Sequence, residues 1–183
     1  MDALELTLRI ADRRAAEEES FERLVRLHER QVLNTAWRML GRIEDAQDAS
    51  QEVFLRLFRN LGKLDGAALN AWLYRVTVNV CLDLAKRRGR LPPEAGDRPE
   101  TASLDPGPEE ASATARKREW MRKALLRLPE KERAALVLRE IEGLTTAEAA
   151  AILESSETTV RSQICSARMK LRKMAVEGGI HEL

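Results

Sequence analysis

Apolar residues recur at every third or fourth position over most of the chain, and this spacing predicts helices. The first expected helix has Ser20 as its N-cap and ends at Gly41, which follows the last apolar position. Further helices are predicted at about residues 44–60, 67–88, 116–127, 129–142, 146–153 and 157–175. No segment alternates apolar and polar residues as a half-buried strand does, so the predicted fold class is all-α.

A proline- and glycine-rich segment interrupts this helical pattern. Five of the six prolines and three glycines fall between residues 89 and 115. Such a composition is typical of a flexible connector, and the segment is longer than an ordinary loop. We therefore predict two small helical domains joined by a flexible, Pro-rich linker. The expected parts are an N-terminal tail (1–19), a first domain (20–88), the linker (89–115), a second domain (116–175) and a C-terminal tail (176–183).

The net charge of +1 hides an uneven distribution of charged residues. Residues 1–88 carry 15 basic and 14 acidic side chains, the linker carries 2 and 6, and residues 116–183 carry 14 and 10. The linker is therefore acidic and the second domain basic. Between residues 158 and 176 there is no Asp or Glu, whereas this span holds Arg161, Arg168, Lys170, Arg172 and Lys173.

The basic span follows a pattern typical of a helix-turn-helix. Thr145 and Glu148 form a capping box ahead of a short, Ala-rich helix, and Ser156 is the expected cap of the next helix. The predicted outward face of this second helix meets the major groove and consists of Thr158, Arg161, Ser162, Cys165, Ser166 and Arg168. Acidic side chains there would repel phosphates, which explains their absence. The alternative is a solvated basic helix that only packs on its neighbours.

Other classes of site have little support in the sequence. Cys81 and Cys165 lie far apart, and with only two histidines the chain predicts neither a disulfide framework nor a metal site. No nucleophile–base pattern indicates an enzyme, and no cofactor is expected. The N-terminus lacks a signal-peptide pattern and no apolar run is long enough for a membrane span, so a cytoplasmic protein is expected.

Four stretches together resemble the extracytoplasmic-function sigma factors, the small two-domain class of bacterial RNA polymerase sigma subunits. "DAQDASQEVFLRLFRNL" is similar to the family's core-polymerase-binding helix, and "AWLYRVTVNVCLDLAKRR" to its promoter-melting helix. "LLRLPEKERAALVLREIEGLTTAEAAAIL" followed by "TTVRSQICSARMKLR" is similar to its upstream-element domain. The resemblance covers roughly residues 20–88 and 116–175.

The resemblance implies roles for particular residues. Core polymerase would bind a polar face made of Asp45, Asp48, Gln51 and Glu52. The single-stranded −10 element would meet Asn79, Arg75, Lys86 and Arg87, with Asn79 holding an extruded base. The second domain would bind the duplex −35 element through the outward face defined above. The implied partners are core RNA polymerase, promoter DNA and an anti-sigma factor.

Three alternatives stay open at this point. A free-standing helix-turn-helix regulator would bind an operator without polymerase, and an adaptor would bind polymerase without a promoter. The polar faces could also be ordinary solvated surface, with Asn79 bonded to a neighbouring helix and Lys86 and Arg87 complementing a helix C-terminus. Cys165 fits a redox switch or simply a small side chain.

Overall fold

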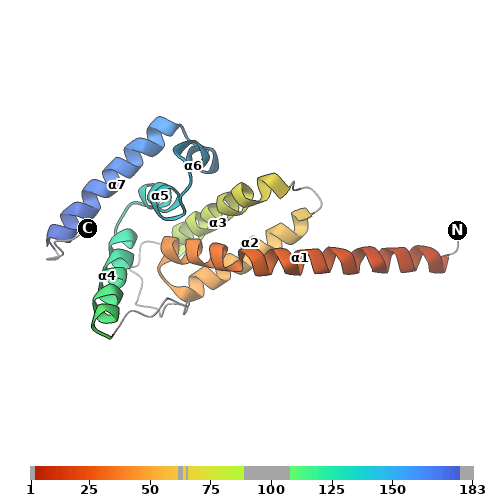
Figure 1. Cartoon of the computed structure of the whole chain (residues 1–183). Coiled ribbons are helices and arrows are strands. Elements are labelled where there is room, and N and C mark those ends of the chain that lie inside the picture. The colour runs from red at the N-terminus through yellow and green to blue at the C-terminus, as the bar shows by residue number, and fades with distance from the viewer. Residues whose placement is uncertain (1–2, 62–63, 65, 89–107, 178–183) are drawn as a thin grey trace.

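The computed structural model describes residues 3–61, 64, 66–88 and 108–177, and every regular element in these ranges is a helix (Figure 1). In chain order the elements are α1 (Ala3–Leu40), α2 (Ile43–Asn60), α3 (Gly66–Arg88), α4 (Pro108–Leu126), α5 (Glu130–Leu136), the π-helix η2 (Val137–Ile141), α6 (Thr146–Ile152) and α7 (Glu157–Glu177). The predicted all-α class is confirmed.

The C-terminal half of α1 packs with α2 and α3 to form a three-helix bundle (Figure 1). The apolar stripes that predicted these helices supply its core, which includes Val32, Ala36, Met39, Ala46, Ala49, Val53, Leu57, Leu69 and Leu73. Leu57 and Leu73 are fully buried, and burial of one such side chain contributes about 1.5–3 kcal/mol. The bundle therefore gives the outward faces of α2 and α3 a rigid support.

The second group of helices consists of α5, η2, α6 and α7, with α4 preceding them. The predicted inner side of α7 is buried, as Val160, Ile164, Ala167 and Leu171 show. The small inner face of α6 is buried too and consists of Ala149, Ala150 and Ile152. Small residues on α6 let it lie close to α7, which holds the helix-turn-helix in one geometry.

Two predicted boundaries are wrong. The first helix begins at Ala3, so Ser20 lies inside it and caps nothing. Residues 3–19 are rich in Ala, Leu, Glu and Arg and contain neither Gly nor Pro, so no local signal interrupts the helix. Helix α4 begins at Pro108, inside the predicted linker, because proline suits the first helical position. The rest of that linker, residues 89–107, lies outside the described residues.

The helix predicted over residues 129–142 is divided. Pro129 stands at the N-cap of α5, and the last turns widen into the π-helix η2. Gly41 and Gly143 end α1 and the η2 segment with positive φ angles of 79° and 76°, which glycine adopts without strain. The predicted stop at Gly41 is confirmed.

The two groups of helices are in contact. Helix α4 and η2 meet α1, and α6 meets α3. The buried apolar residues of both groups form one continuous cluster that runs from Val32 in α1 to Leu171 in α7. The described helices therefore form a single packed body, with the N-terminal part of α1 projecting beyond it (Figure 1).

Candidate nucleic-acid interface

The helix-turn-helix is fixed by local hydrogen bonds. The Glu148 backbone N–H donates to the Thr145 hydroxyl at 3.2 Å, and the Thr145 N–H donates to the Glu148 carboxylate at 2.7 Å, so the predicted capping box is confirmed. The Thr145 hydroxyl also donates to the Glu148 carboxylate at 2.6 Å, and this bond together with that from the Thr145 N–H lowers the pKa of Glu148 and keeps it charged at the helix N-terminus. Ser156 caps α7 by accepting from the Thr159 N–H at 3.1 Å.

The turn between α6 and α7 depends on Glu154, which has a φ of 49°. A left-handed conformation is costly for a residue with a Cβ atom, and glycine is common at such positions. The Ser155 N–H donates to the Ala150 carbonyl at 3.0 Å and closes the turn. The turn therefore sets the angle at which α7 leaves α6.

The outward face of α7 contains five of the six residues predicted for it. Thr158, Arg161, Ser162, Cys165 and Arg168 are exposed. Ser166 is the exception, because it is half-buried and its hydroxyl donates to the Glu132 carboxylate of α5 at 3.0 Å. The prediction that Ser166 faces outward is wrong, since this side of α7 packs against α5.

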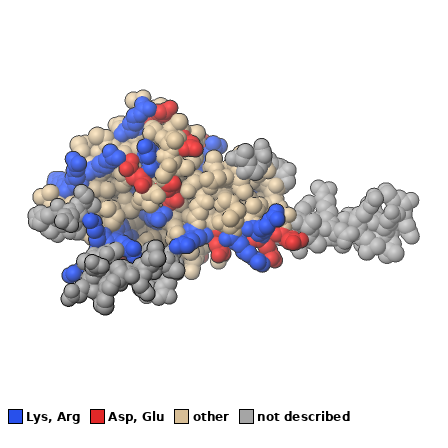
Figure 2. Space-filling view, viewed as in Figure 1, with Lys and Arg blue, Asp and Glu red and all other residues tan. Residues whose placement is uncertain are grey.

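The basic stretch of α7 contains no acidic residue, but acidic side chains from just before it and from other helices pair with its basic residues. Arg161 pairs with Glu157 at 2.6 Å within the first turns of α7. Arg168 pairs with Glu140 of η2 at 2.9 Å, and Lys170 pairs with Glu132 of α5 at 2.7 Å. Figure 2 shows basic side chains interspersed with acidic ones over this part of the molecule. The face is therefore less positive than the sequence of α7 suggests.

The outward face of α3 carries the other predicted DNA contacts. Arg75, Asn79, Lys86 and Arg87 are all exposed. The side chains at 75, 79 and 86 follow the helical repeat, so they form a stripe along one side of α3. Arg75 donates to the Ala151 carbonyl of α6 at 3.4 Å, so one end of this stripe lies beside the helix-turn-helix.

The predicted polar face of α2 is present, with one correction. Asp48 and Gln51 are exposed, and the half-buried Glu52 pairs with Arg56 at 2.7 Å. Asp45 is only 6% exposed and therefore does not belong to this exposed face. Its position next to the buried Ala46 and Ala49 places it at the edge of the bundle core.

Two apolar residues extend the α2 face and were missed by sequence reasoning. Leu55 is 52% exposed and Phe58 is 50% exposed. They lie seven residues after Asp48 and Gln51 respectively, which places each on the same side of the helix as its partner. Their position off the apolar stripe was the available signal. A face that combines acidic and large apolar side chains suits a protein partner better than a nucleic acid.

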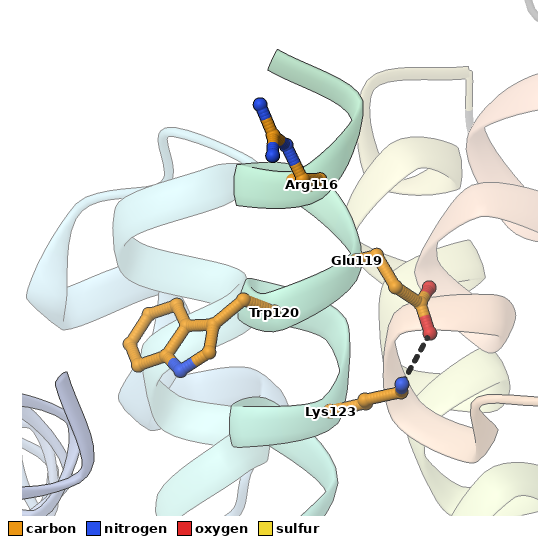
Figure 3. Close-up of a pocket in the computed structure, with 4 residues that line it drawn as sticks. All are labelled: Arg116, Glu119, Trp120 and Lys123. Atoms are coloured by element: carbon orange, nitrogen blue, oxygen red, sulfur yellow. Dashed lines mark ion pairs between the residues drawn. The ribbon is translucent and has the colours of Figure 1, made fainter. Parts of the chain in front are cut away.

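The described residues also form a surface hollow outside these three faces. A shallow hollow of about 460 Å³ beside α4 is lined by Arg116, Glu119, Trp120 and Lys123, all from one helix (Figure 3). Hydrogen bonds from Arg122 lower the pKa of Glu119, which makes it a poor general base. The described residues contain no cluster of three metal-ligating side chains, and no described helix has the length and apolar character needed to cross a membrane.

Comparison with known protein families gives two matches that follow the order of the chain. Residues 24–91 match Sigma-70 region 2, and residues 118–171 match Sigma-70, region 4. The first match covers the three-helix bundle, and the second runs from the C-terminal half of α4 through α5, η2 and α6 into α7. The two candidate DNA-binding faces therefore lie one in each matched region.

Several curated proteins are similar to this chain. The ECF RNA polymerase sigma factor SigE of Mycolicibacterium smegmatis is 39% identical over 155 residues, which cover 84% of this chain and 60% of SigE. The RNA polymerase sigma-H factor of Pseudomonas aeruginosa is 32% identical over 84% of this chain and 85% of its own length. SigM of Mycobacterium tuberculosis is 34% identical, with coverage of 87% and 79%.

Two solved structures resemble the whole fold. The structure of CnrH in complex with the cytosolic domain of CnrY has a TM-score of 0.62 and 26% identity, and the match covers 87% of this chain and 90% of CnrH. The sigma factor RpoE of Bartonella quintana, in complex with the anti-sigma factor NepR, has a TM-score of 0.67 and 22% identity, with coverage of 85% and 96%. The second likeness concerns the fold alone.

Proposed function

Because the chain belongs to the extracytoplasmic-function (ECF) sigma factors, we propose that it is a promoter-specificity subunit of bacterial RNA polymerase. It would bind core polymerase, contact the −35 and −10 promoter elements and aid promoter melting, while the polymerase supplies the catalysis in the cytoplasm. The observation that carries this proposal is the presence of both sigma regions in one chain, each with an exposed face suited to DNA.

We assign −35 contact to the exposed face of α7. Arg161 and Ser162 lie in the first turns, where a recognition helix meets base edges in the major groove. A bidentate arginine contact contributes about 1–3 kcal/mol of discrimination. The pairs that Arg161 and Arg168 make with acidic residues must exchange for phosphate or base contacts, so this face alone should bind DNA weakly.

Contact with the melted −10 element belongs to the α3 stripe. The exposed Asn79 offers both a donor and an acceptor, which a base edge requires. A base taken out of the stack loses a few kcal/mol of stacking, which the protein must compensate. Lys86 and Arg87 follow at the end of the same helix and would contact phosphates.

The α2 face is the proposed surface for core polymerase. Asp48, Gln51 and Glu52 supply the polar part, while Leu55 and Phe58 supply exposed apolar area. We also propose that the chain has an anti-sigma factor. This is supported by the likeness to CnrH, whose solved structure contains the cytosolic domain of CnrY.

The test is a binding titration on a promoter duplex and a scrambled duplex at about 100 mM salt, with and without core polymerase. Two elements two helical turns apart lie roughly 70 Å from each other, so the free chain should bind promoter weakly and with little preference. Core polymerase should raise specific binding strongly by holding the two regions at the required distance. Tight, sequence-specific binding by the isolated chain would instead support a free-standing regulator.

A matched pair of variants identifies the contact on α7. Arg161→Ala should reduce transcription from a −35-dependent promoter about ten-fold, because one base or phosphate contact is lost. Arg127→Ala removes the same charge from an exposed position that lies outside the three proposed faces, and should have little effect. Equal activity of the two variants would exclude Arg161 from promoter contact.

A further inference from the structure

One carboxylate joins the two groups of helices. Glu142 follows η2, and its side chain is only 9% exposed. The Thr35 hydroxyl donates to Oε1 at 3.0 Å and the Arg38 guanidinium donates to the same oxygen at 2.6 Å. The Tyr74 hydroxyl donates to Oε2 at 3.2 Å. All three donors belong to α1 and α3 of the first bundle, so the Glu142 carboxylate is bound across the interface.

The π-helix explains how Glu142 reaches this position. The Glu142 N–H donates to the Val137 carbonyl, five residues back, at 2.9 Å, and the Leu144 N–H donates to the Leu138 carbonyl at 3.1 Å. Wider turns shift the side chains that follow to a different side of the axis, and such segments recur at functional positions. A carboxylate at a helix C-terminus is disfavoured by the helix dipole, so local energetics do not account for Glu142.

Two smaller contacts accompany the Glu142 cluster. The Arg122 guanidinium of α4 is 6% exposed and donates to the Gly41 carbonyl at 3.0 Å. Leu126 packs directly on Gly41, where a Cβ atom would overlap the Cδ1 atom of Leu126. The interface therefore adds buried polar bonds to the apolar cluster that the two groups share, and the polar bonds fix how the groups are oriented.

This arrangement conflicts with simultaneous contact to two promoter elements. Helix α6 lies directly against α3, and Arg75 of the α3 stripe bonds to the Ala151 carbonyl of α6. Elements about two helical turns apart are roughly 70 Å from each other, so a body in which these helices touch cannot contact both. The second group of helices must leave the first bundle before the proposed function can be performed.

We propose that Glu142, with Thr35, Arg38 and Tyr74, forms an intramolecular clasp that holds the free chain closed, and that promoter engagement requires this clasp to open. The need for opening depends on the proposed sigma function, whereas closure itself depends only on contacts within the chain. Because the four groups are polar, they regain hydrogen bonds with water on separation, which lowers the free-energy cost of breaking the clasp.

The experiment measures a distance in the full-length chain without polymerase or DNA. A spin label on the exposed Cys165 of α7 and a second label on Glu29→Cys, an exposed position on α1, report the separation of the two groups. Cys81 is buried, and burial raises the pKa of its thiol to about 12, so it should stay unlabelled. The expected result for the unmodified interface is one narrow distance.

Glu142→Ala should shift the population toward longer distances. Because the lost hydrogen bonds involve a charged group, we expect the ratio of closed to open chains to fall by about ten- to hundred-fold. The matched control is Glu140→Ala, which removes the same charge from the neighbouring η2 segment. Glu140 pairs with Arg168 inside the second group, so the distance should not change. Circular dichroism checks that both variants keep their helical content.

Two variants test the same contact from the other side of the interface. Arg38→Ala should also open the chain, and the double variant should open it no further than Glu142→Ala, since Glu142→Ala already removes the bond between Arg38 and the carboxylate. Tyr74→Phe removes a single hydroxyl without leaving a cavity and should give a smaller shift, which keeps the test valid if Glu142→Ala loses helicity.

Either of two results would overturn the proposal: a broad distance distribution in the unsubstituted interface, or identical distributions for Glu142→Ala and Glu140→Ala. Neither measurement depends on promoter activity, so failure of the clasp and failure of the proposed sigma function are distinguishable. Addition of core polymerase then tests the link between them, with the distance expected to lengthen as the chain opens.

Discussion

The acidic residues around α7 should limit how tightly this protein binds DNA. Glu140 pairs with Arg168 at 2.9 Å, and the Arg168 side chain is 59% exposed on the face proposed to meet the −35 element. Contact between Arg168 and a phosphate must break or share this pair, and the Glu140 carboxylate then lies close to the negative DNA backbone. The substitution Glu140→Gln keeps the shape of the side chain and removes its charge.

The magnitude follows from two contributions. An exposed ion pair contributes about 0.2–1 kcal/mol. In the Glu140→Gln variant this pair is absent, so DNA binding does not have to break it. Repulsion between a carboxylate and a phosphate about 8 Å away in water is about 0.5 kcal/mol. Together these give about 0.7–1.5 kcal/mol, so Glu140→Gln should tighten binding to duplex DNA about three- to thirteen-fold.

The assay is fluorescence anisotropy with a labelled duplex, measured at several salt concentrations. The gain should be largest at low salt and should shrink as salt screens the charges. Glu177→Gln is the matched control, because it removes the same charge near the end of α7, where Glu177 lies 3.9 Å from Lys173. Equal gains for the two variants would show a general charge effect and refute the assignment of Arg168 to the DNA face.

Three further predictions address the other faces and the turn. Asn79→Ala should leave closed-complex formation intact and reduce promoter opening, because an extruded base loses its hydrogen bonds; normal permanganate reactivity on duplex promoter would contradict this. Charge reversal of Asp48 and Glu52 to Lys should weaken competition for core polymerase while the urea midpoint stays nearly unchanged, since exposed charges contribute little to stability; unaltered competition would show that the α2 face is only solvated surface. Glu154→Gly should raise the free energy of unfolding by about 0.5–1 kcal/mol in urea titrations, because it relieves a left-handed residue with a φ of 49° at some cost in chain entropy; a loss of stability would mean that the Glu154 side chain makes a needed contact.

Much of the fold was predictable because its signals are local. The inner face of α7, from Val160 to Leu171, follows from helical periodicity alone. The Thr145–Glu148 capping box and the stop at Gly41 involve residues close in sequence, so their bonds and angles do not depend on distant parts of the chain. The exposure of Asn79 and Arg161 follows from the same periodicity.

Other features depend on contacts between segments far apart in sequence. The sequence of α7 predicts a bare basic face, but Glu132 and Glu140 approach it only after α5 and η2 fold against it. The same packing turns Ser166 inward, and the edge of the bundle core buries Asp45. Periodicity places a residue on a side of its helix and does not specify which neighbour occupies that side.

The contact between the two groups of helices shows this limit most clearly. The sequence by itself determined the helices, their order and the helix-turn-helix, because hydrophobic spacing and capping act over a few residues. Only the tertiary structure decided that Glu142 meets Thr35, Arg38 and Tyr74, which lie between 68 and 107 residues away along the chain. Such a cluster has no sequence period, because its geometry arises from a widened turn in η2 and from the way two preformed bodies pack together.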